Sequence, residues 1–416
     1  MRMLYTFALF LLLPWALLHL WLRGRRQPAY LEHVSDRFGF PDTDPGTPLI
    51  WVHAVSVGET RAAEPLIKAL RQRHPSHRIL LTHATPTGRQ TGVELFGDSV
   101  GRCYLPYDFP FAVKRFLRHF RPQVGIVMET EIWPNLLEHC QRSSIPVYLV
   151  NARMSEKSAR GYARFRSLSR VALLKLAGIG AQTERDAARL GELGAEAVKV
   201  TGNIKFDRTA PPEMLALGTR LRELFGKRKV FLAASTREGE EALILDALTG
   251  LDMAELLVVI VPRHPQRFEE IGVLLRQHGR AFVRRSDGRP VGTDIGVVLG
   301  DSMGEMFAYY SASDVAFVGG SLLPLGGQNL LEACAVGRPV IVGPHTFNFE
   351  EATEGAIEAG AALRVADAPA LAKAVVTLLR DPGRREAMAE AGRRFTQEHR
   401  GATERTMAML KWKAGG

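Results

Sequence analysis

Charged, polar and glycine residues follow three strand-like apolar runs in the second half of the chain. They are Arg263 and His264 after VVIVP, then Asp301, Ser302, Gly304 and Glu305 after VVLG, then Gln328, Asn329 and Glu332 after the loop GGSLLPLGG. Glycines let backbone approach a ligand closely, and the start of a helix offers N–H groups to a phosphate. We expect a helix to open near Gln328 or Asn329 and to bring Glu332 to ribose hydroxyls. Together the three motifs predict a nucleotide site, although no P-loop lysine follows the glycines.

Carboxylates dominate the corresponding positions of the first half. Glu59 follows the run HAVSVG, where a strand turns into a helix, and Glu129 and Glu131 follow another strand, beside Trp133 and Asn135. A glutamate in the first turn of a helix is often placed there by the helix dipole alone. The alternative is that Glu59 is a general base, and the residues by themselves leave both interpretations open.

Basic residues are concentrated in the same half. Residues 1–210 hold 29 Lys and Arg against 18 Asp and Glu, whereas the remainder holds 25 against 26. The segment NARMSEKSARGYARFR places Arg153, Lys157, Arg160 and Arg164 at helical spacing, with Glu156 opposing them. Such a stripe is usually a solvated face. Here it indicates contact with phosphate groups or with an anionic membrane surface.

The elements that position these residues alternate regularly. Apolar strand-like runs are separated by stretches with apolar residues every three or four positions, which predicts βαβ units and two mainly parallel sheets. The expected strands are 49–55, 78–84, 123–129, 146–151, 177–182 and 197–202, and then 230–235, 256–262, 280–285, 295–300, 315–320 and 339–344. Open sheets of this kind bind ligands beyond the carboxyl ends of their strands, where the motifs lie.

An apolar segment precedes the first sheet. Residues 4–22 carry no formal charge and are long enough to span a bilayer at ~1.5 Å per residue. Arg23, Arg25 and Arg26 follow directly, so the positive-inside rule keeps the remainder cytoplasmic. We therefore expect an inner-membrane, single-pass anchor rather than a cleaved signal peptide, with an interfacial helix as the other alternative. The three scattered cysteines, Cys103, Cys140 and Cys334, fit reduced thiols in a cytoplasmic body.

Seven motifs resemble the signatures of bacterial Kdo transferases, where Kdo is 3-deoxy-D-manno-octulosonic acid. They are HAVSVGE, ETEIWPN, NARMSEKS, TGNIKFD, PRHPQRF, GDSMGE and GGSLLPLGGQNLLE. The resemblance extends from the apolar segment to about residue 350. It implies a GT-B fold, with two Rossmann-like domains facing across a cleft, and transfer of Kdo from CMP-Kdo to a phosphorylated lipid A precursor.

The same resemblance implies roles for individual residues. Glu59 would be the general base, and Glu129 and Lys205 would stabilise the transition state. The residues expected to bind CMP are Arg263, His264, Met303, Gly304, Glu305, Asn329, Leu330, Leu331 and Glu332. A base on the face opposite the leaving group implies inversion, by analogy with inverting glycosidases. The sequence holds no paired-aspartate metal motif, so we expect neither a metal ion nor another cofactor.

These observations predict four regions. They are an anchor at 1–22, an acceptor domain at 23–208, a linker at 209–228 and a donor domain with terminal helices at 229–416. A sugar-nucleotide epimerase would share the glycine loop but would need neither the anchor nor the basic half. A membrane-tethered nucleic-acid-binding protein would leave the strand-end carboxylates without a role, and the chain lacks interleaved aromatic and basic residues, so we expect no nucleic-acid partner.

Overall fold

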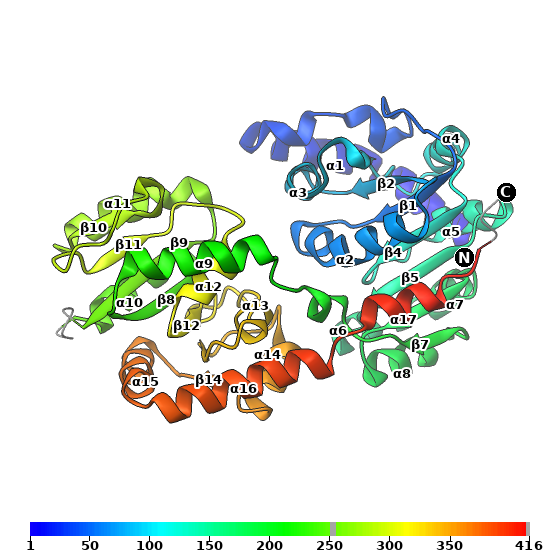
Figure 1. The fold of residues 1–416 in the computed structure, drawn as a ribbon. Helices are drawn as coiled ribbons and strands as arrows, with labels where there is room; N and C mark the ends of the chain where they lie inside the picture. The colour runs from blue at the N-terminus through cyan, green and yellow to red at the C-terminus, as the bar shows by residue number, and fades with distance from the viewer. Residues whose placement is uncertain (250–254, 413–416) are drawn as a thin grey trace. The chain divides into compact units, whose positions relative to one another are not determined.

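The computed structural model describes residues 1–249 and 255–412, which fold into two compact units. Unit 1 comprises Met1–Asp207 together with the chain from Arg400 onward, and unit 2 comprises Arg208–His399. Each unit has its own sheet with helices packed on it (Figure 1). The expected α/β class with two wound sheets is confirmed.

The sheet of unit 1 has seven parallel strands in the order β3-β2-β1-β4-β5-β6-β7. Its strands are β1 (Leu49–His53), β2 (Arg78–His83), β3 (Gly101–Tyr104), β4 (Val124–Met128), β5 (Val147–Ala152), β6 (Gly178–Ala181) and β7 (Val198–Val200). Its helices are α1 (Arg2–Arg26), α2 (Val57–Arg73), α3 (Pro86–Phe96), α4 (Pro110–Phe120), α5 (Pro134–Arg142), α6 (Glu156–Ala163), α7 (Arg166–Leu173), α8 (Glu184–Glu192) and α17 (Ala402–Met409).

Central strands of this sheet are apolar on both faces. In β1, Leu49 and Trp51 join one buried cluster while Ile50 and Val52 join the cluster on the other side. Period-two alternation sends neighbouring side chains to opposite faces, so a strand covered by helices on both sides needs a continuous apolar run. This arrangement places β1 and its parallel neighbour β4 in the middle of the sheet. Their carboxyl ends therefore lie side by side, along the same border of the sheet.

Unit 2 repeats the architecture with the order β10-β11-β9-β8-β12-β13-β14, again parallel throughout. Its strands are β8 (Lys229–Thr236), β9 (Leu256–Pro262), β10 (Phe282–Arg284), β11 (Val297–Leu299), β12 (Val315–Val318), β13 (Val340–Val342) and β14 (Ala362–Arg364). Its helices are α9 (Pro212–Phe225), α10 (Glu240–Ala247), α11 (Phe268–Gln277), α12 (Met306–Ala312), α13 (Leu331–Ala335), α14 (Glu350–Glu358), α15 (Ala368–Arg380) and α16 (Pro382–Glu398).

Sequence reasoning missed one strand in each sheet. β3 and β14 are short, and each lies at an edge of its sheet. Edge strands are covered less completely than central ones, and both of these have partly exposed residues. Their sequences, GRCY and ALR, therefore lack the continuous apolar run that marks the central strands.

The unit boundaries differ from those expected. Residues 209–228 form mainly helix α9, which packs against α12 within unit 2 and is not a free linker. The end of the chain returns to unit 1, where Met407 and Met409 enter its core and Tyr148 donates a 2.6 Å hydrogen bond to the carbonyl of Lys411. This return depends on contacts between residues more than 200 positions apart, which local sequence patterns do not encode.

Helix α1 is long and apolar enough, by length and composition, to cross a membrane. Its first turns nevertheless contact unit 1. Thr6 and Asn135 of α5 exchange hydrogen bonds of 3.0 and 3.1 Å, Arg2 lies 3.5 Å from Glu138, and the Phe10 ring lies 5.0 Å from that of Phe109. These contacts hold the N-terminal end of α1 against the rest of unit 1, although most of the helix surface is exposed and apolar.

Candidate active site

Glu59 lies in the first turn of α2, directly beyond the carboxyl end of β1. Its Oε2 accepts a 2.9 Å hydrogen bond from the Val55 N–H, and its Oε1 accepts one of 3.1 Å from the Ser56 hydroxyl. Ser56 is also the N-cap of α2. Burial, reinforced by the charges of Glu129 and Glu131, raises the pKa of Glu59 to about 8, against the opposing effect of these hydrogen bonds.

Glu129 follows β4, the strand paired with β1, at the same edge of the sheet. Its φ of 57° is uncommon outside glycine, and such conformations persist where the surrounding structure imposes them, often at functional sites. The Glu129 carboxylate lies 3.2 Å from the Lys205 ammonium. Since Lys205 comes from a 3-10 turn far along the chain, only folding brings this pair together.

Glu131 completes the carboxylate cluster. It accepts a 2.6 Å hydrogen bond from the Trp133 indole, while burial raises its pKa. Asn135 has a different role, because its backbone N–H and side-chain amide both donate to Asp108 and the side chain is fully buried. The structure therefore brings Glu59, Glu129 and Glu131 to one edge and assigns Asn135 to packing.

The basic stripe is only partly helical. Helix α6 begins at Glu156 after the N-cap Ser155, so Arg153 precedes it and Arg164 is its C-cap. Lys157 and Arg160 are exposed on α6, and Arg160 pairs with Glu156 at 3.3 Å. An exposed ion pair of this kind contributes at most ~1 kcal/mol to stability, so another anion can readily replace Glu156 as the partner of Arg160. The expectation of one helical face from 153 to 164 was thus wrong, although the cations remain close in sequence.

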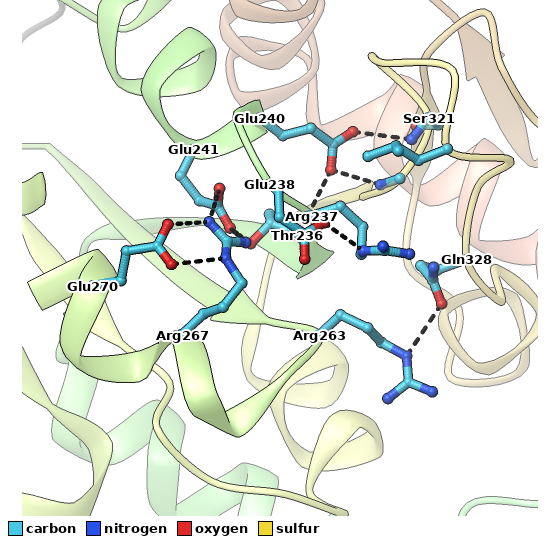
Figure 2. Close-up of polar contacts among 12 residues, drawn as sticks. Thr236, Arg237, Glu238, Glu240, Glu241, Arg263, Arg267, Glu270, Ser321 and Gln328 are labelled. Atoms are coloured by element: carbon cyan, nitrogen blue, oxygen red, sulfur yellow. Dashed lines mark hydrogen bonds and ion pairs between the residues drawn. The ribbon is translucent and has the colours of Figure 1, made fainter. Parts of the chain in front are cut away.

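In unit 2, the glycine-rich loop after β12 is organised by Glu240, at the start of α10. This buried carboxylate accepts backbone hydrogen bonds from Gly320, Ser321 and Leu322 at 2.6–3.0 Å, and one of 2.9 Å from Arg237 (Figure 2). Three loop N–H groups therefore point to one side chain. The sequence analysis missed Glu240, although its place after a strand and in a first helical turn matches that of Glu59.

Two further glycines of this loop, Gly326 and Gly327, have backbone conformations that favour glycine. Gly326 and Gly327 have φ of 93° and 76°, which residues with a Cβ rarely adopt. A Cβ on Gly326 would also lie 2.2 Å from the Asn348 side chain. The loop is thus restricted to glycine at the turn that leads to Gln328, whose side chain accepts a 3.3 Å hydrogen bond from Arg263 (Figure 2).

Arg263 and His264 follow β9 as expected. Partial burial and the neighbouring charge of Arg263 lower the pKa of His264. A second buried group lies beside them, where Arg267 makes two hydrogen bonds of 2.7 and 3.0 Å to Glu241 (Figure 2). This pair, also missed from the sequence, holds the segment after β9 against the start of α10.

The segment after β11 combines polar side chains that are held by hydrogen bonds with a backbone that is open to solvent. Glu305 accepts a 2.6 Å hydrogen bond from Ser302 and lies 3.3 Å from Arg285, while Met303 is 47% exposed and Gly304 has φ of 81°. The polar groups are thus held in place, and the backbone around Gly304 is open, since an added Cβ there would meet nothing within 4 Å.

Helix α13 begins later than expected, at Leu331. Its first N–H donates to the Asn329 side chain at 3.1 Å, and the side chains of Leu330 and Leu331 are buried in the core. The helix thus begins two residues after Asn329, and Leu330 is its N-cap. Glu332 lies within the helix and pairs with Arg208, with Asn329 at 3.4 Å.

Comparison with known proteins identifies the family. The model for 3-deoxy-D-manno-octulosonic-acid transferases (kdotransferases) matches residues 32–208, and that for group 1 glycosyl transferases matches 280–395. The sequence is 47% identical to the 3-deoxy-D-manno-octulosonic acid transferase of Bordetella pertussis, over 99% of both chains. The chain belongs to the Kdo transferase family. The enzyme is also 39% identical to the Haemophilus influenzae transferase, over 99% of this chain and 98% of that one.

Solved structures of low identity share the fold of this Kdo transferase. A glycosyltransferase from Rickettsia africae superposes with a TM-score of 0.58 at 14% identity, covering 87% of this chain and 97% of that one. The UDP-GlcNAc 2-epimerase from Neisseria meningitidis gives 0.57 at 17% identity, covering 87% and 99%. These matches confirm the two-unit α/β architecture and carry no information about the substrate of the enzyme.

Proposed function

We propose that the enzyme transfers Kdo from CMP-Kdo to a phosphorylated lipid A precursor, with inversion and with Glu59 as the general base. The transfer of Kdo follows from membership of the family, and the role of Glu59 is supported by its position beyond β1, beside Glu129, which pairs with Lys205 at 3.2 Å. Burial there raises the pKa of Glu59 to about 8. A general base works best when its pKa lies near the operating pH, and burial moves Glu59 into that range.

The transfer balances with these groups. The acceptor hydroxyl attacks the anomeric carbon of Kdo, its proton passes to the Glu59 carboxylate, and the bond to the CMP phosphate breaks with its electron pair on the phosphate. We assign Glu129 and Lys205 to stabilising the charges that develop on the sugar and its carboxylate, since fixed charges in a partly buried site act strongly. No metal ion is required in this scheme, because the leaving group is already a stabilised anion.

The donor is assigned to unit 2. Arg263 and His264 suit the phosphate, and the backbone around Met303, Gly304 and Glu305 is open enough to approach a base or ribose. The 329–332 segment contributes through Asn329 and Glu332, because Leu330 and Leu331 are core residues. Glu332, paired with Arg208, would accept hydrogen bonds from the ribose hydroxyls.

The acceptor is assigned to unit 1 and to the membrane. We propose that the cations Arg153, Lys157, Arg160 and Arg164 contact its phosphates or the anionic surface, and that α1 holds the enzyme on the cytoplasmic face of the inner membrane. The sequence favoured a spanning anchor. Arg2 and Thr6 of α1 instead contact α5, which favours an α1 that lies along unit 1 within one membrane leaflet. The lipid of that leaflet would also cover the exposed apolar side chains of α1.

One experiment tests the proposed reaction. Purified enzyme, CMP-Kdo and a tetraacylated, bisphosphorylated lipid A precursor should give products heavier by whole Kdo residues in mass spectra, with release of CMP. Activity should persist after treatment with EDTA. The proposal fails if CMP-Kdo is consumed without a glycosylated lipid product, or if no product forms with an acceptor that bears both phosphates.

A further inference from the structure

An apolar pocket of about 730 Å³ lies between the first turns of α1 and helices α5 to α7. Leu4 and Ala8 of α1 form one wall, and Ile132, Leu168 and Ala172 contribute to the others. This volume falls within the ~300–1,000 Å³ range of small-molecule sites. The residues assigned to the proposed Kdo transfer do not line this pocket.

Two polar side chains in the lining, Ser169 and Tyr162, donate their hydroxyl hydrogens to backbone carbonyls. The Ser169 hydroxyl, in α7, donates to the Tyr162 carbonyl of α6 at 2.9 Å, and the Tyr162 hydroxyl donates to the Thr130 carbonyl at 3.1 Å. Because these donors are engaged with backbone oxygens, the pocket presents a nearly apolar interior. A hydrocarbon chain suits such a lining, whereas a sugar or a nucleotide would lose its hydrogen bonds there.

The pocket adjoins the carboxylate cluster. Thr130, whose carbonyl is bound by Tyr162, lies between Glu129 and Glu131, and the next residue, Ile132, lines the pocket. A single short segment therefore has catalytic carboxylates at one end and the pocket at the other. A ligand whose polar head reaches Glu59 can place an apolar tail in the pocket.

Cations and a bulky apolar residue flank the same pocket. Helix α6 contributes Ser158 and Gly161 to the lining while it carries Lys157 and Arg160 on its exposed surface, and Phe165, also in the lining, is 62% exposed. Positive charge next to an apolar pocket matches a molecule that combines phosphate with hydrocarbon. The α1 wall is itself covered by exposed apolar side chains, which suit a membrane leaflet.

We propose that this pocket, the acyl pocket, binds one acyl chain of the acceptor lipid and so orients the sugar hydroxyl toward Glu59. The inference rests on the proposed function for the identity of the acceptor. It assigns α1 a part in substrate binding beyond attachment, because the pocket loses a wall when α1 is absent.

Gly161 and Gly191 provide a matched pair of variants. Both glycines lie in exposed positions of helices, and an added Cβ meets nothing within 4 Å at either one, but only Gly161 lines the pocket. Gly161→Trp should fill the pocket and raise the KM for the acylated acceptor about tenfold or more, with kcat and the KM for CMP-Kdo unchanged. Gly191→Trp should match the wild type, and the deacylated acceptor should inhibit both variants with the same Ki. A Gly161→Trp enzyme with the wild-type KM overturns the proposal.

A second measurement does not depend on turnover. An acceptor with a photoreactive diazirine at the end of an acyl chain should label peptides from residues 1–8 and 158–172, and Gly161→Trp should abolish this labelling. Labelling confined to other peptides rejects the acyl pocket. Failure of the proposed function gives a different result: the wild type then forms no Kdo-bearing product, whether or not the pocket is labelled.

Discussion

Glu59 makes the contacts of a helix-start carboxylate and also has the environment of a buried base. Glu59 lies in the first turn of α2, as the dipole-based interpretation of the sequence expected, and the N-cap Ser56 hydrogen-bonds to it. A helix-start role alone does not require burial, nor does it require Glu129 and Glu131 nearby, which together raise the pKa of Glu59. The two interpretations are therefore compatible, and measurements on one substitution separate their contributions.

We predict that Glu59→Gln lowers the transfer rate by ~10²-fold or more while leaving CMP-Kdo affinity unchanged, because Gln keeps the shape but takes no proton. Folded Glu59 keeps its proton up to about pH 8, against 4.5 for the free group. The folded state therefore binds this proton more tightly than the unfolded state does. The resulting stabilisation is fully present below about pH 4.5 and is lost as the pH rises through 8. The variant should therefore be at least as stable as the wild type at pH 9. Normal turnover in the folded variant would reject Glu59 as the base.

The pH dependence of the wild-type reaction gives a separate prediction. The base must be deprotonated, so kcat/KM should rise about tenfold per pH unit and level off near the Glu59 pKa of about 8. Steady-state rates between pH 5.5 and 9.5 measure this limb, and Glu59→Gln should lack it. A profile that is already flat above pH 5.5 would show that the group in control has an ordinary carboxylate pKa.

At the scale of elements, two of the functional segments are loops held by a residue from another strand–helix unit of the same sheet. Glu240 at the start of α10 fixes the loop after β12, and Lys205 beyond β7 pairs with Glu129 beyond β4. Such cross-connections let a loop keep an open backbone without losing its shape.

We predict that Glu240→Gln destabilises unit 2 by ~2–4 kcal/mol and weakens CMP binding, because an amide cannot accept hydrogen bonds at both ends from the N–H groups of Gly320, Ser321 and Leu322. Calorimetry of CMP binding and chemical denaturation measure the two effects. Glu238→Gln, two residues away and 54% exposed, is the control and should behave like the wild type. Unchanged CMP affinity in folded Glu240→Gln would remove the glycine-rich loop from the donor site.

At the scale of the whole molecule, the ends of the chain both belong to unit 1. Helix α17 returns to the core of unit 1 after the chain has formed unit 2, and α1 lies on unit 1 through Thr6 and Phe10. The first and last segments are thus parts of unit 1, the unit that we propose to bind the acceptor. Changes at either end should affect the acceptor side of the reaction more than donor binding.

We predict that removing residues 1–22 releases the protein from membranes and preserves CMP binding, because the candidate CMP-binding residues all lie in unit 2. An epitope tag placed before Met1 of the full chain should be digested by protease in inverted inner-membrane vesicles and protected in intact spheroplasts. This is expected because Arg2 and Thr6 contact α5 of unit 1, which we propose to lie on the cytoplasmic side. Digestion in spheroplasts alone would establish the spanning anchor and would contradict the acyl pocket.

The sequence by itself determined the features that depend on neighbours in the chain. Apolar periodicity predicted the central strands, and the motifs after them predicted where Glu59, Glu129, Arg263 and Glu332 lie. Such patterns record whether a segment is covered on one face or two. They missed the edge strands β3 and β14, which lack a continuous apolar run, although they found the other two edge strands, β7 and β10. They also carried the family resemblance, which the comparisons confirmed.

Only the tertiary structure decided the features that depend on packing between distant segments. The raised pKa of Glu59, the Glu129–Lys205 pair and the role of Glu240 all arise from burial and from charges brought together by folding. The return of α17 and the position of α1 likewise rest on contacts across more than a hundred residues. Desolvation and pairing energies are properties of a residue's surroundings, and the linear order of residues does not specify those surroundings.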